Sequence, residues 1–363
     1  MWFAYLLACI PTIIGAVLWV TDRKVVWQEW AIATAIAFAT AGIFHATAIL
    51  GMTADTETWS GKIYDATFDP EWVERYTETY TTTDKKGNTH THTRTCHRTH
   101  YDEWSCRDTI GCTHSITPAF FADIRKNFNS YITKDGGKSG LIRGDPNIYE
   151  VHNTTNYNYP VTAWKHFENR VKAAPSLFSY SPVPEGTPVF PYPANDNWQQ
   201  SNRLLGTIGI SILEWDRMNA RLGPSKKVNV ILINFGERDS SISHLQEAKW
   251  IGGKKNDLVL CYGKGWSYVF GWTEQDLVKL NLQTILLGKV DNDTIPVIEK
   301  EISQNYRLKD WSKFDYISVE PPTWSFIVLV IVMLFTEGGF WIWALIQGPE
   351  YFSDFRRNRW RRY

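Results

Sequence analysis

The chain has no excess of charge and few cysteines, and it lacks the motifs that mark several classes of function. Its 38 lysines and arginines balance 38 aspartates and glutamates, and no basic patch is present, so nothing predicts nucleic-acid binding. None of the five cysteines stands in the paired C-x2-C spacing of a zinc ribbon. The stretch "GGKKND" (252–257) lacks the spacing of a P-loop, and no Ser/His/Asp or Cys/His triad can be identified.

Long apolar runs are present at both ends of the chain. They cover Trp2–Val20, Trp30–Leu50 and Trp324–Gln347, and each is long enough to cross a bilayer as a helix of about 20 residues. The first run has neither the basic start nor the small-residue cleavage site of a signal peptide. The sequence therefore predicts three transmembrane helices.

Positive charges near these runs predict the orientation in the membrane. Arg23 and Lys24 lie between the first two runs, and the tail "RRNRWRRY" follows the third. Such clusters stay on the cytoplasmic side. We therefore expect a multi-pass protein of the plasma or bacterial inner membrane, with its N-terminus outside, its C-terminus in the cytoplasm and residues 51–323 extracytoplasmic.

Small residues recur along one face of the second run. The stripe consists of Ala31, Ala35, Ala39, Gly42 and Ala46. Small side chains let helices approach closely in lipid. The stripe predicts either packing among the three spans or a seam between copies in a homo-oligomer.

Two polar residues interrupt the predicted spans, His45 and Glu337. An ionisable residue at membrane depth suggests function, and an ion-coupled channel is one hypothesis. From the outer ends of their spans, Glu337 lies about 20 Å deep and His45 about 8 Å deep, so we do not expect them to pair. We interpret Glu337 as a neutral residue near the inner face, or as bonded to a carbonyl exposed by the neighbouring Gly338 and Gly339.

A long β-hairpin is predicted over residues 72–104. The segment alternates, is rich in Thr and Tyr, and contains the turn "DKKGN" (84–88), in which Gly and Asn tolerate positive φ. Placing Thr83 opposite Thr89 also places Glu78 opposite Arg94 and Glu74 opposite Arg98, with a ladder of threonines on the other face. A slip of one residue would lose both charge pairs.

Histidines and cysteines on this hairpin raise the question of a metal. His90 and His92 share a face near the tip, but no further ligands lie nearby, so a metal is not expected there. Cys96, Cys106 and Cys112 belong to an oxidising compartment, which favours a disulfide over zinc. We expect two of these three cysteines to form a disulfide, most simply Cys96 with Cys106 or Cys112, and the sequence does not decide the pairing.

The whole pattern predicts an α+β membrane protein with several segments. These are two transmembrane helices in 1–50, a β-rich hairpin module in 51–132, a loop and Pro-rich connector in 133–197, an α/β module in 198–320, the third span in 324–347 and a basic tail in 348–363. Thr117 and Pro118 predict a helix start. Further helices are expected over Val161–Lys172 and from Trp198 to Leu222.

The α/β module begins with a short apolar segment, Lys227–Phe235, that is typical of a strand buried on both faces. A helix, a two-stranded hairpin and two more helices follow, the first of these opened by a Thr273/Asp276 capping box. This order is typical of an α/β layer sandwich.

Residues 227–287 resemble a TPM domain. The matching pieces are "VNVILINF", "HLQEAKWIGGKKND", "LVLCYG" and "WSYVFGW". Asn256-Asp257 stands where the family usually has Asn-Gly, and only Gly271 remains of its Gly-rich tract. TPM domains often lie outside the membrane beside transmembrane helices, and the layout is similar to that of uncharacterised membrane proteins of bacteria and large phages.

The resemblance implies two kinds of function. Some TPM proteins are metal-dependent phosphatases, and others are assembly or channel-accessory factors. A phosphohydrolase would hold a divalent cation between carboxylates at strand ends, for which Asp239, Asp257 and Glu274 are the candidates. Each of them can also be read as a cap, turn or first-turn residue. We therefore expect a membrane-anchored interaction protein that presents the TPM-like module to a protein partner.

Overall fold

The computed structural model describes residues 2–21, 27–178, 180, 182–194, 197–199 and 201–347. These residues form two compact units. The first consists of Met1–Asp55, His166–Ser181 and Trp311–Tyr363, and the second of Thr56–Lys165 and Pro182–Asp310. The first unit is helical and the second contains the sheets, so the predicted mixed α+β class is confirmed.

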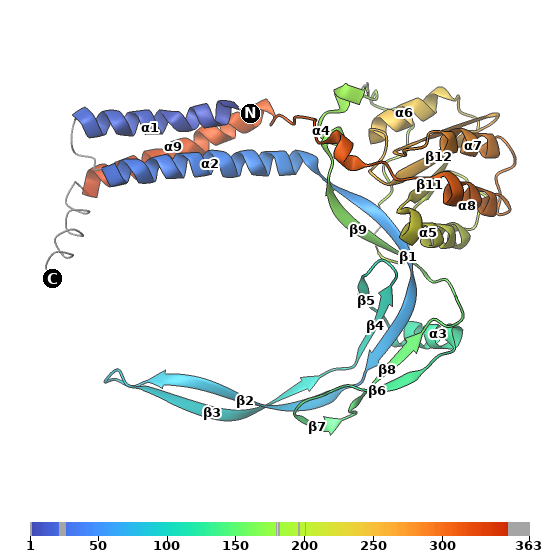
Figure 1. Cartoon of the computed structure of the whole chain (residues 1–363), viewed down its shortest axis with the longest axis horizontal. Coiled ribbons are helices and arrows are strands. Elements are labelled where there is room, and N and C mark those ends of the chain that lie inside the picture. Colours follow the sequence, from blue (N-terminus) through green and yellow to red (C-terminus); the bar gives the residue numbers. More distant parts are fainter. Residues whose placement is uncertain are drawn as a thin grey trace. The chain divides into compact units, whose positions relative to one another are not determined.

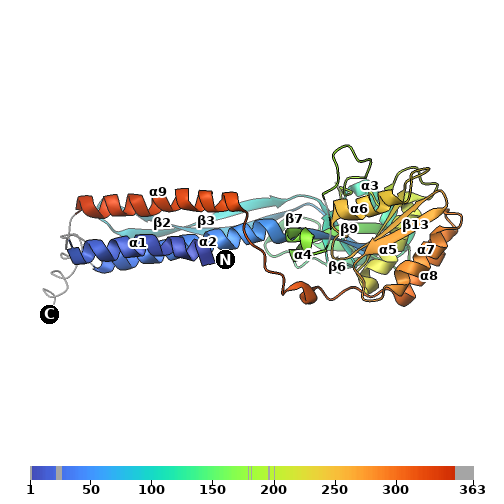
Figure 2. The same cartoon turned by 90° about the horizontal axis from the view of Figure 1, so that it is seen from above.

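Three helices of the first unit run side by side in both views (Figures 1 and 2). They are α1 (Trp2–Thr21), α2 (Trp27–Thr53) and α9 (Thr323–Gln347). Among the described residues, two helices are long and apolar enough to cross a membrane: α2 and the Thr323–Trp343 part of α9. The apolar part of α1, Tyr5–Val17, is shorter. The basic loop and tail that predict the orientation lie outside the described residues.

The small-residue stripe of α2 does not face the other two helices. Ala33, Ala37 and Ala41 are fully buried instead and pack with residues of α1 and α9. The predicted stripe lies on the exposed side, where Ala31, Ala35, Ala39 and Ala46 are exposed and a Cβ added at Gly42 would meet nothing within 4 Å. The expected intramolecular packing through this stripe is therefore wrong, because a neighbouring face of α2 is equally rich in small residues.

The second unit contains a sheet built around β1 (Ala54–Asp69), with strand order β5-β4-β1-β8-β6 and β9 also paired to β1. The other strands are β4 (Glu103–Asp108), β5 (Thr113–Ser115), β6 (Ile132–Asp135), β8 (Asn147–His152) and β9 (Pro160–Glu168). The predicted helix α3 (Pro118–Phe128) packs on it and begins as expected, because the Thr117 hydroxyl accepts a hydrogen bond from the Phe120 N–H at 3.2 Å.

Residues 133–197 are more regular than expected. They contain β6 to β9, and the predicted helix over Val161–Lys172 is β9 followed by the short helix α4 (Arg170–Ala173). Two 3-10 turns, η1 (Pro175–Phe178) and η2 (Trp311–Phe314), complete the first unit. β9 forms because β1 offers a partner strand that is distant in the sequence.

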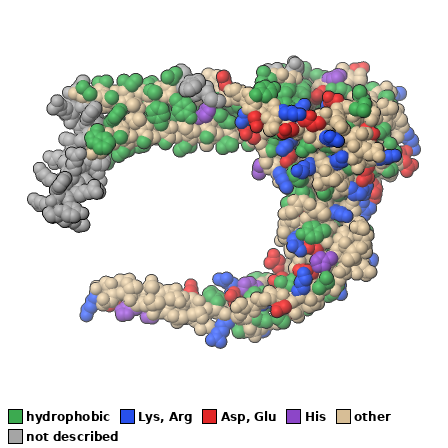
Figure 3. Space-filling model, in the orientation of Figure 1, with side chains coloured by type: hydrophobic (Ala, Val, Ile, Leu, Met, Phe, Trp, Pro, Cys, Tyr) green, Lys and Arg blue, Asp and Glu red, His purple; other side chains and the backbone are tan. Residues whose placement is uncertain are grey.

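The long hairpin consists of β2 (Trp72–Thr83) and β3 (Thr89–His100), and its predicted register is confirmed. Arg94 lies 2.7 Å from Glu78, whereas the carboxylate of Glu74 is hydrogen-bonded to the His100 ring at 3.0 Å instead of pairing with Arg98. Among the described strands, β7 (Leu141–Gly144) is the further partner of this hairpin, and it pairs with the base of β2. Most of this two-stranded arm shows uncharged polar side chains and backbone on its surface (Figure 3).

The predicted disulfide is absent, because all five cysteines are free thiols. Strand register explains why. Cys96 lies opposite Tyr76 on the arm, and Cys106 lies opposite His114 within the sheet. Cys112 is bonded to Asp108 instead of facing Cys106: the Asp108 N–H donates to the Cys112 carbonyl at 3.1 Å, and the Cys112 N–H donates to the Asp108 carboxylate at 2.9 Å.

The α/β part of the second unit has the strand order β10-β11-β12-β13. These strands are β10 (Leu204–Leu205), β11 (Asn229–Asn234), β12 (Asp257–Gly263) and β13 (Trp266–Gly271), and only β13 is antiparallel to its neighbour. One face packs against α5 (Ile212–Lys226), α7 (Leu277–Leu286) and α8 (Thr294–Asn305). The other face packs against α6 (Ser241–Trp250) and residues 189–192 of the Pro-rich segment.

The predicted layer sandwich is therefore present, but two helix starts differ from expectation. Helix α5 begins at Ile212, well after Trp198, because Leu204 and Leu205 pair with β11. The predicted capping box does not form. The Thr273 hydroxyl donates to the Arg307 carbonyl at 3.0 Å, and α7 begins only at Leu277.

Candidate functional site

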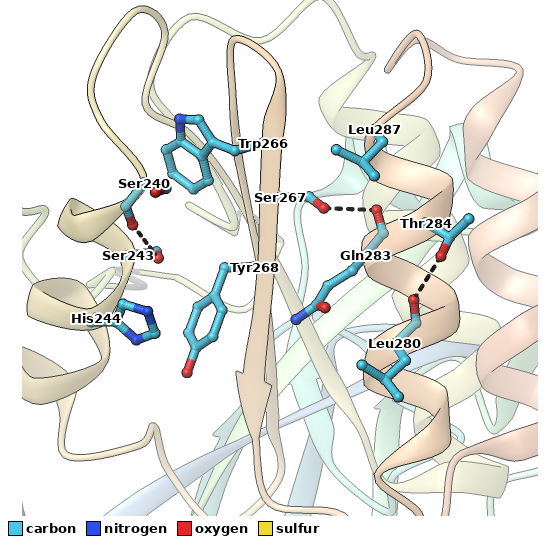
Figure 4. Close-up of a pocket in the computed structure, with 10 residues that line it drawn as sticks. All are labelled: Ser240, Ser243, His244, Trp266, Ser267, Tyr268, Leu280, Gln283, Thr284 and Leu287. Atoms are coloured by element: carbon cyan, nitrogen blue, oxygen red, sulfur yellow. Dashed lines mark hydrogen bonds between the residues drawn. The ribbon is translucent and has the colours of Figure 1, made fainter.

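A cleft of about 500 Å³ opens at the edge of this sheet (Figure 4). Its floor is β13, and its two walls are the N-terminal part of α6 and the C-terminal half of α7. The lining residues are Ser240, Ser243, His244, Trp266, Ser267, Tyr268, Leu280, Gln283, Thr284 and Leu287. A cleft of this size and mixed lining is typical of a binding site.

Strand β13 is the last strand of its sheet, so its outer edge has no strand partner in the described part of the chain. The loop that joins it to β12 has two residues, Lys264 and Gly265. Such a loop makes Gly263 and Trp266 a hydrogen-bonded pair. By alternation, Ser267 and Val269 then direct their main-chain N–H and C=O groups away from β12 and toward the cleft.

Aromatic side chains form the α6 side of the cleft. Trp266 and Tyr268 point toward α6 (Figure 4), and the Tyr268 ring packs edge-on against His244 with centroids 4.5 Å apart. The Tyr268 hydroxyl donates to Glu247 at 2.5 Å, and the Trp266 Nε1–H donates to the Arg238 carbonyl at 2.8 Å. These hydrogen bonds hold both rings in place, so the wall is preformed.

The α7 side combines polar groups with exposed leucines. The Ser267 hydroxyl donates to the Gln283 carbonyl at 2.7 Å, which ties β13 to the helix. Leu280 and Leu287 each keep 59% of their surface exposed. Exposed leucines beside a polar, preformed cleft offer an apolar contact to a bound molecule.

Asp257, the first catalytic candidate, is fully buried at the start of β12. Its carboxylate accepts hydrogen bonds from the Asn229 side chain at 2.8 Å, the Lys254 N–H at 2.8 Å and the Tyr192 hydroxyl at 2.9 Å. Burial raises the pKa of Asp257. A side chain so enclosed holds the fold together and is not open to a substrate.

The other two candidates lie elsewhere on the surface. Asp239 follows the carboxyl end of β11 and accepts from the Ser241 N–H at 2.9 Å, which lowers its pKa. Because β11 and β12 are parallel, Asp257 lies where these strands begin, whereas Asp239 follows the end of β11, and the strand between these two levels is about 17 Å long. Glu274 is exposed and accepts from the Asp310 N–H at 2.9 Å. The described residues contain no group of three or more His, Cys, Asp or Glu side chains that could hold a metal.

A buried ionic network beside Asp257 could not be foreseen from the sequence. The Arg203 guanidinium donates to Asn229 at 2.6 Å, to the Ser60 hydroxyl at 2.7 Å and to Asp216 at 3.2 Å. Arg203 keeps only 2% of its surface exposed, and burial lowers its pKa and raises that of Asp216. The network ties β1 to the α/β sheet, and Arg203 lies in a stretch that the sequence predicts as helix.

His45 and Glu337 are not brought together, as expected. The His45 ring lies 6.1 Å from the Tyr5 ring, whereas Glu337 lines a cavity between α1 and α9. Neither carboxyl oxygen of Glu337 has a hydrogen-bond partner in the described chain. Of the two interpretations given for Glu337, the bond to a carbonyl exposed by glycine is therefore not formed within the described residues.

Comparisons with known proteins find no match to this chain among protein-family models, curated proteins or solved structures. The geometry of the sites is therefore the basis on which the function of this chain is inferred. The sequence did predict β13 as a strand, but not that it is an edge strand. The only signal was its composition, because "WSYVFG" is more polar than the neighbouring strands "NVILIN" and "DLVLCYG".

Proposed function

We propose that this chain is a membrane-anchored interaction protein whose TPM-like α/β module binds an extended segment of a partner protein along β13. The observation that carries the proposal is the preformed cleft over an unpaired strand edge. An added strand would bond the outward main-chain groups of Ser267 and Val269. Its side chains would alternate between the two walls.

The two walls define what the partner segment should contain. Leu280 and Leu287 favour an apolar side chain on the α7 side. His244, Tyr268 and Ser243 favour a side chain that combines an apolar body with a hydrogen-bonding group on the α6 side. We therefore expect alternating apolar and polar residues in the bound segment.

The membrane part would hold this module at the surface. We propose three spans, α1, α2 and α9, with the N-terminus outside, the C-terminus in the cytoplasm and residues 51–323 extracytoplasmic. The exposed stripe of α2, from Ala31 to Ala46, supports a homo-oligomer through close helix contact. Such an arrangement would present several clefts together, which raises avidity for a repeated partner.

A metal-dependent phosphohydrolase, the alternative that the TPM resemblance suggests, has less support. Such an enzyme needs carboxylates around one cation. Asp239 and Asp257 lie beyond opposite ends of the parallel strands, and Asp257 is fully buried. An ion-coupled channel would use Glu337, for which a binding role is argued below.

The proposal can be tested with random peptides displayed on phage and selected on the full chain in nanodiscs. Ser267→Pro removes the outward N–H donor, while the hydrogen bonds to β12 stay in place. Ser267→Ala is the matched control, because it loses the same hydroxyl but keeps the N–H. We expect binding of the enriched peptides to fall about tenfold on Ser267→Pro and to change little on Ser267→Ala.

Two results would contradict the proposal. The first is a failure to enrich any peptide on the folded chain. The second is equal binding of the enriched peptides to both Ser267 variants. The far-ultraviolet circular dichroism of both variants should match the parent, which separates lost binding from lost folding.

A further inference from the structure

A second cavity, of about 220 Å³, lies between α1 and α9 of the first unit. It has room for about seven water-sized groups. Its lining is mostly hydrocarbon, and Glu337 is the one ionisable residue among the residues that line it. The other contributors include Leu7, Pro11, Met333 and Trp341.

Glu337 is buried, and none of the described residues forms a hydrogen bond with its carboxyl group. Only 4% of its surface is exposed, and neither carboxyl oxygen has a hydrogen-bond partner within the described part of the chain. An unsatisfied buried polar group costs several kcal/mol in a medium without water. Its position beside Gly338, where an added Cβ would meet nothing within 4 Å, leaves space for a group that could satisfy it.

Two more polar atoms around this cavity lack their usual partners. Pro11 has no N–H, so the Leu7 carbonyl loses the donor that an α-helix normally supplies. Trp341, which also lines the cavity, has a buried Nε1–H for which the described residues offer no acceptor. Among the lining residues, Glu337 therefore supplies unbonded acceptors and Trp341 an unbonded donor beside an apolar enclosure.

We infer that this cavity binds the hydroxyl group of a neutral amphiphile dissolved in the membrane, such as a long-chain alcohol. A hydroxyl group donates one hydrogen bond and accepts others. It can therefore donate to Glu337 and accept from Trp341. A neutral ligand avoids the cost of bringing a charge into hydrocarbon, and the lining matches an apolar body.

The cavity can be reached from the side of the helical bundle. Ile10 and Ile14 of α1 and Leu334 of α9 line it and keep 52%, 48% and 69% of their surfaces exposed. In a bilayer this rim would face lipid, so an amphiphile could enter laterally. The inference rests on the membrane anchoring proposed above, but not on the β13 cleft.

The test uses the full chain in lipid vesicles and three photoreactive probes of equal chain length. One probe is a medium-chain alcohol that carries a diazirine, the second is its methyl ether and the third is the corresponding amine. We expect saturable labelling of α1 and α9 by the alcohol, about tenfold above the methyl ether. Glu337→Leu and Trp341→Phe should each reduce this labelling several-fold.

Thr336→Val is the matched control. Thr336 neighbours Glu337 but is exposed, and its hydroxyl is bonded to the Val332 carbonyl at 2.9 Å, so labelling should not change. Equal labelling by alcohol and ether, stronger labelling by the amine, or labelling that survives Glu337→Leu would overturn the inference. Crosslinks between α1 or α9 of two copies would also overturn it, since a second copy would then fill the cavity.

Resistance to alkaline carbonate extraction separates this inference from the proposed anchoring. If a variant stays in the membrane but labelling is not specific, only the ligand inference fails. If the parent chain is extracted, the membrane anchoring itself fails.

Discussion

The Tyr192 hydroxyl donates to both carboxylate oxygens of Asp257, at 2.9 Å from Oδ2 and 3.1 Å from Oδ1. Tyr192 belongs to the Pro-rich segment, and Asp257 is the first residue of β12. The bond therefore attaches an irregular segment to the end of the sheet at which the parallel strand β12 begins. It also explains why a carboxylate that resembles a catalytic residue in the sequence is enclosed by protein.

Asp257→Asn should destabilise the second unit without changing any hydrolytic activity. The new amide would direct an NH2 group at surrounding donors, which we expect to cost about 2–3 kcal/mol. Urea unfolding followed by tryptophan fluorescence measures this change, and the exposed Glu237→Gln should stay within about 0.5 kcal/mol. Phosphomonoester hydrolysis that requires Mg²⁺ or Ca²⁺ and is lost in a folded Asp257→Asn chain would contradict the structural role.

Arg203→Met should be among the most damaging single changes in the second unit. It would leave Asp216 buried without its counter-charge and remove the donors to Ser60 and Asn229. We expect a loss of about 3–5 kcal/mol in the free energy of unfolding. The control is Arg221→Met, which breaks an exposed pair with Glu299 and should cost at most about 1 kcal/mol. Similar losses in both variants would refute the role given to Arg203.

We expect the free energy of unfolding to decrease at alkaline pH because of the buried thiol of Cys106. Burial raises the pKa of its thiol from 9.0 to about 12. Between these values the folded chain keeps a proton that the unfolded chain releases, so folding stability decreases as the pH rises through this window. Unfolding measured below pH 9 and within the window should show a steeper decline for the parent than for Cys106→Ala.

The same thiol should resist alkylation in the folded chain at pH 8, because it is 1% exposed and protonated. Peptide mapping under non-reducing conditions tests this. A crosslinked peptide joining Cys106 to Cys96 or Cys112 would show that a disulfide forms after all.

The two alanine faces of α2 should respond differently to leucine. Ala37 is fully buried, so Ala37→Leu should overpack the three-helix bundle and cost about 1–3 kcal/mol. Ala39 is exposed, so Ala39→Leu should leave thermal stability in detergent unchanged but weaken self-association. Chemical crosslinking in the membrane measures the second effect, and unchanged crosslinking would remove the support for an oligomer seam.

Local patterns predicted the hairpin and the α/β order well. The register of β2 and β3 follows from pairing charges and threonines across a single turn, and all of this information lies within one short stretch. The cap at Thr117 and the buried strand β11 are local in the same sense. Such elements depend little on the rest of the chain.

Elements that depend on distant partners were mispredicted. The sequence of β9 predicts a helix, but the segment becomes a strand because it pairs with β1, and the connector strands β6 and β8 depend on the same sheet. The cleft was missed for a related reason. Whether β13 lies at an edge is decided by the order of all four strands, and composition alone does not contain that order.

The central position of β1 has a consequence for how the chain is made. Ala66 pairs with Cys106 on one side and with Val151 on the other, and the Ser60 hydroxyl accepts a hydrogen bond from Arg203. During synthesis from the N-terminus, β1 therefore emerges long before any of these partners exists. Pairings so distant in sequence form slowly and leave a strand open to wrong contacts. We therefore expect the yield of folded protein to depend on the chaperones that are present in the compartment where β1 first emerges during synthesis.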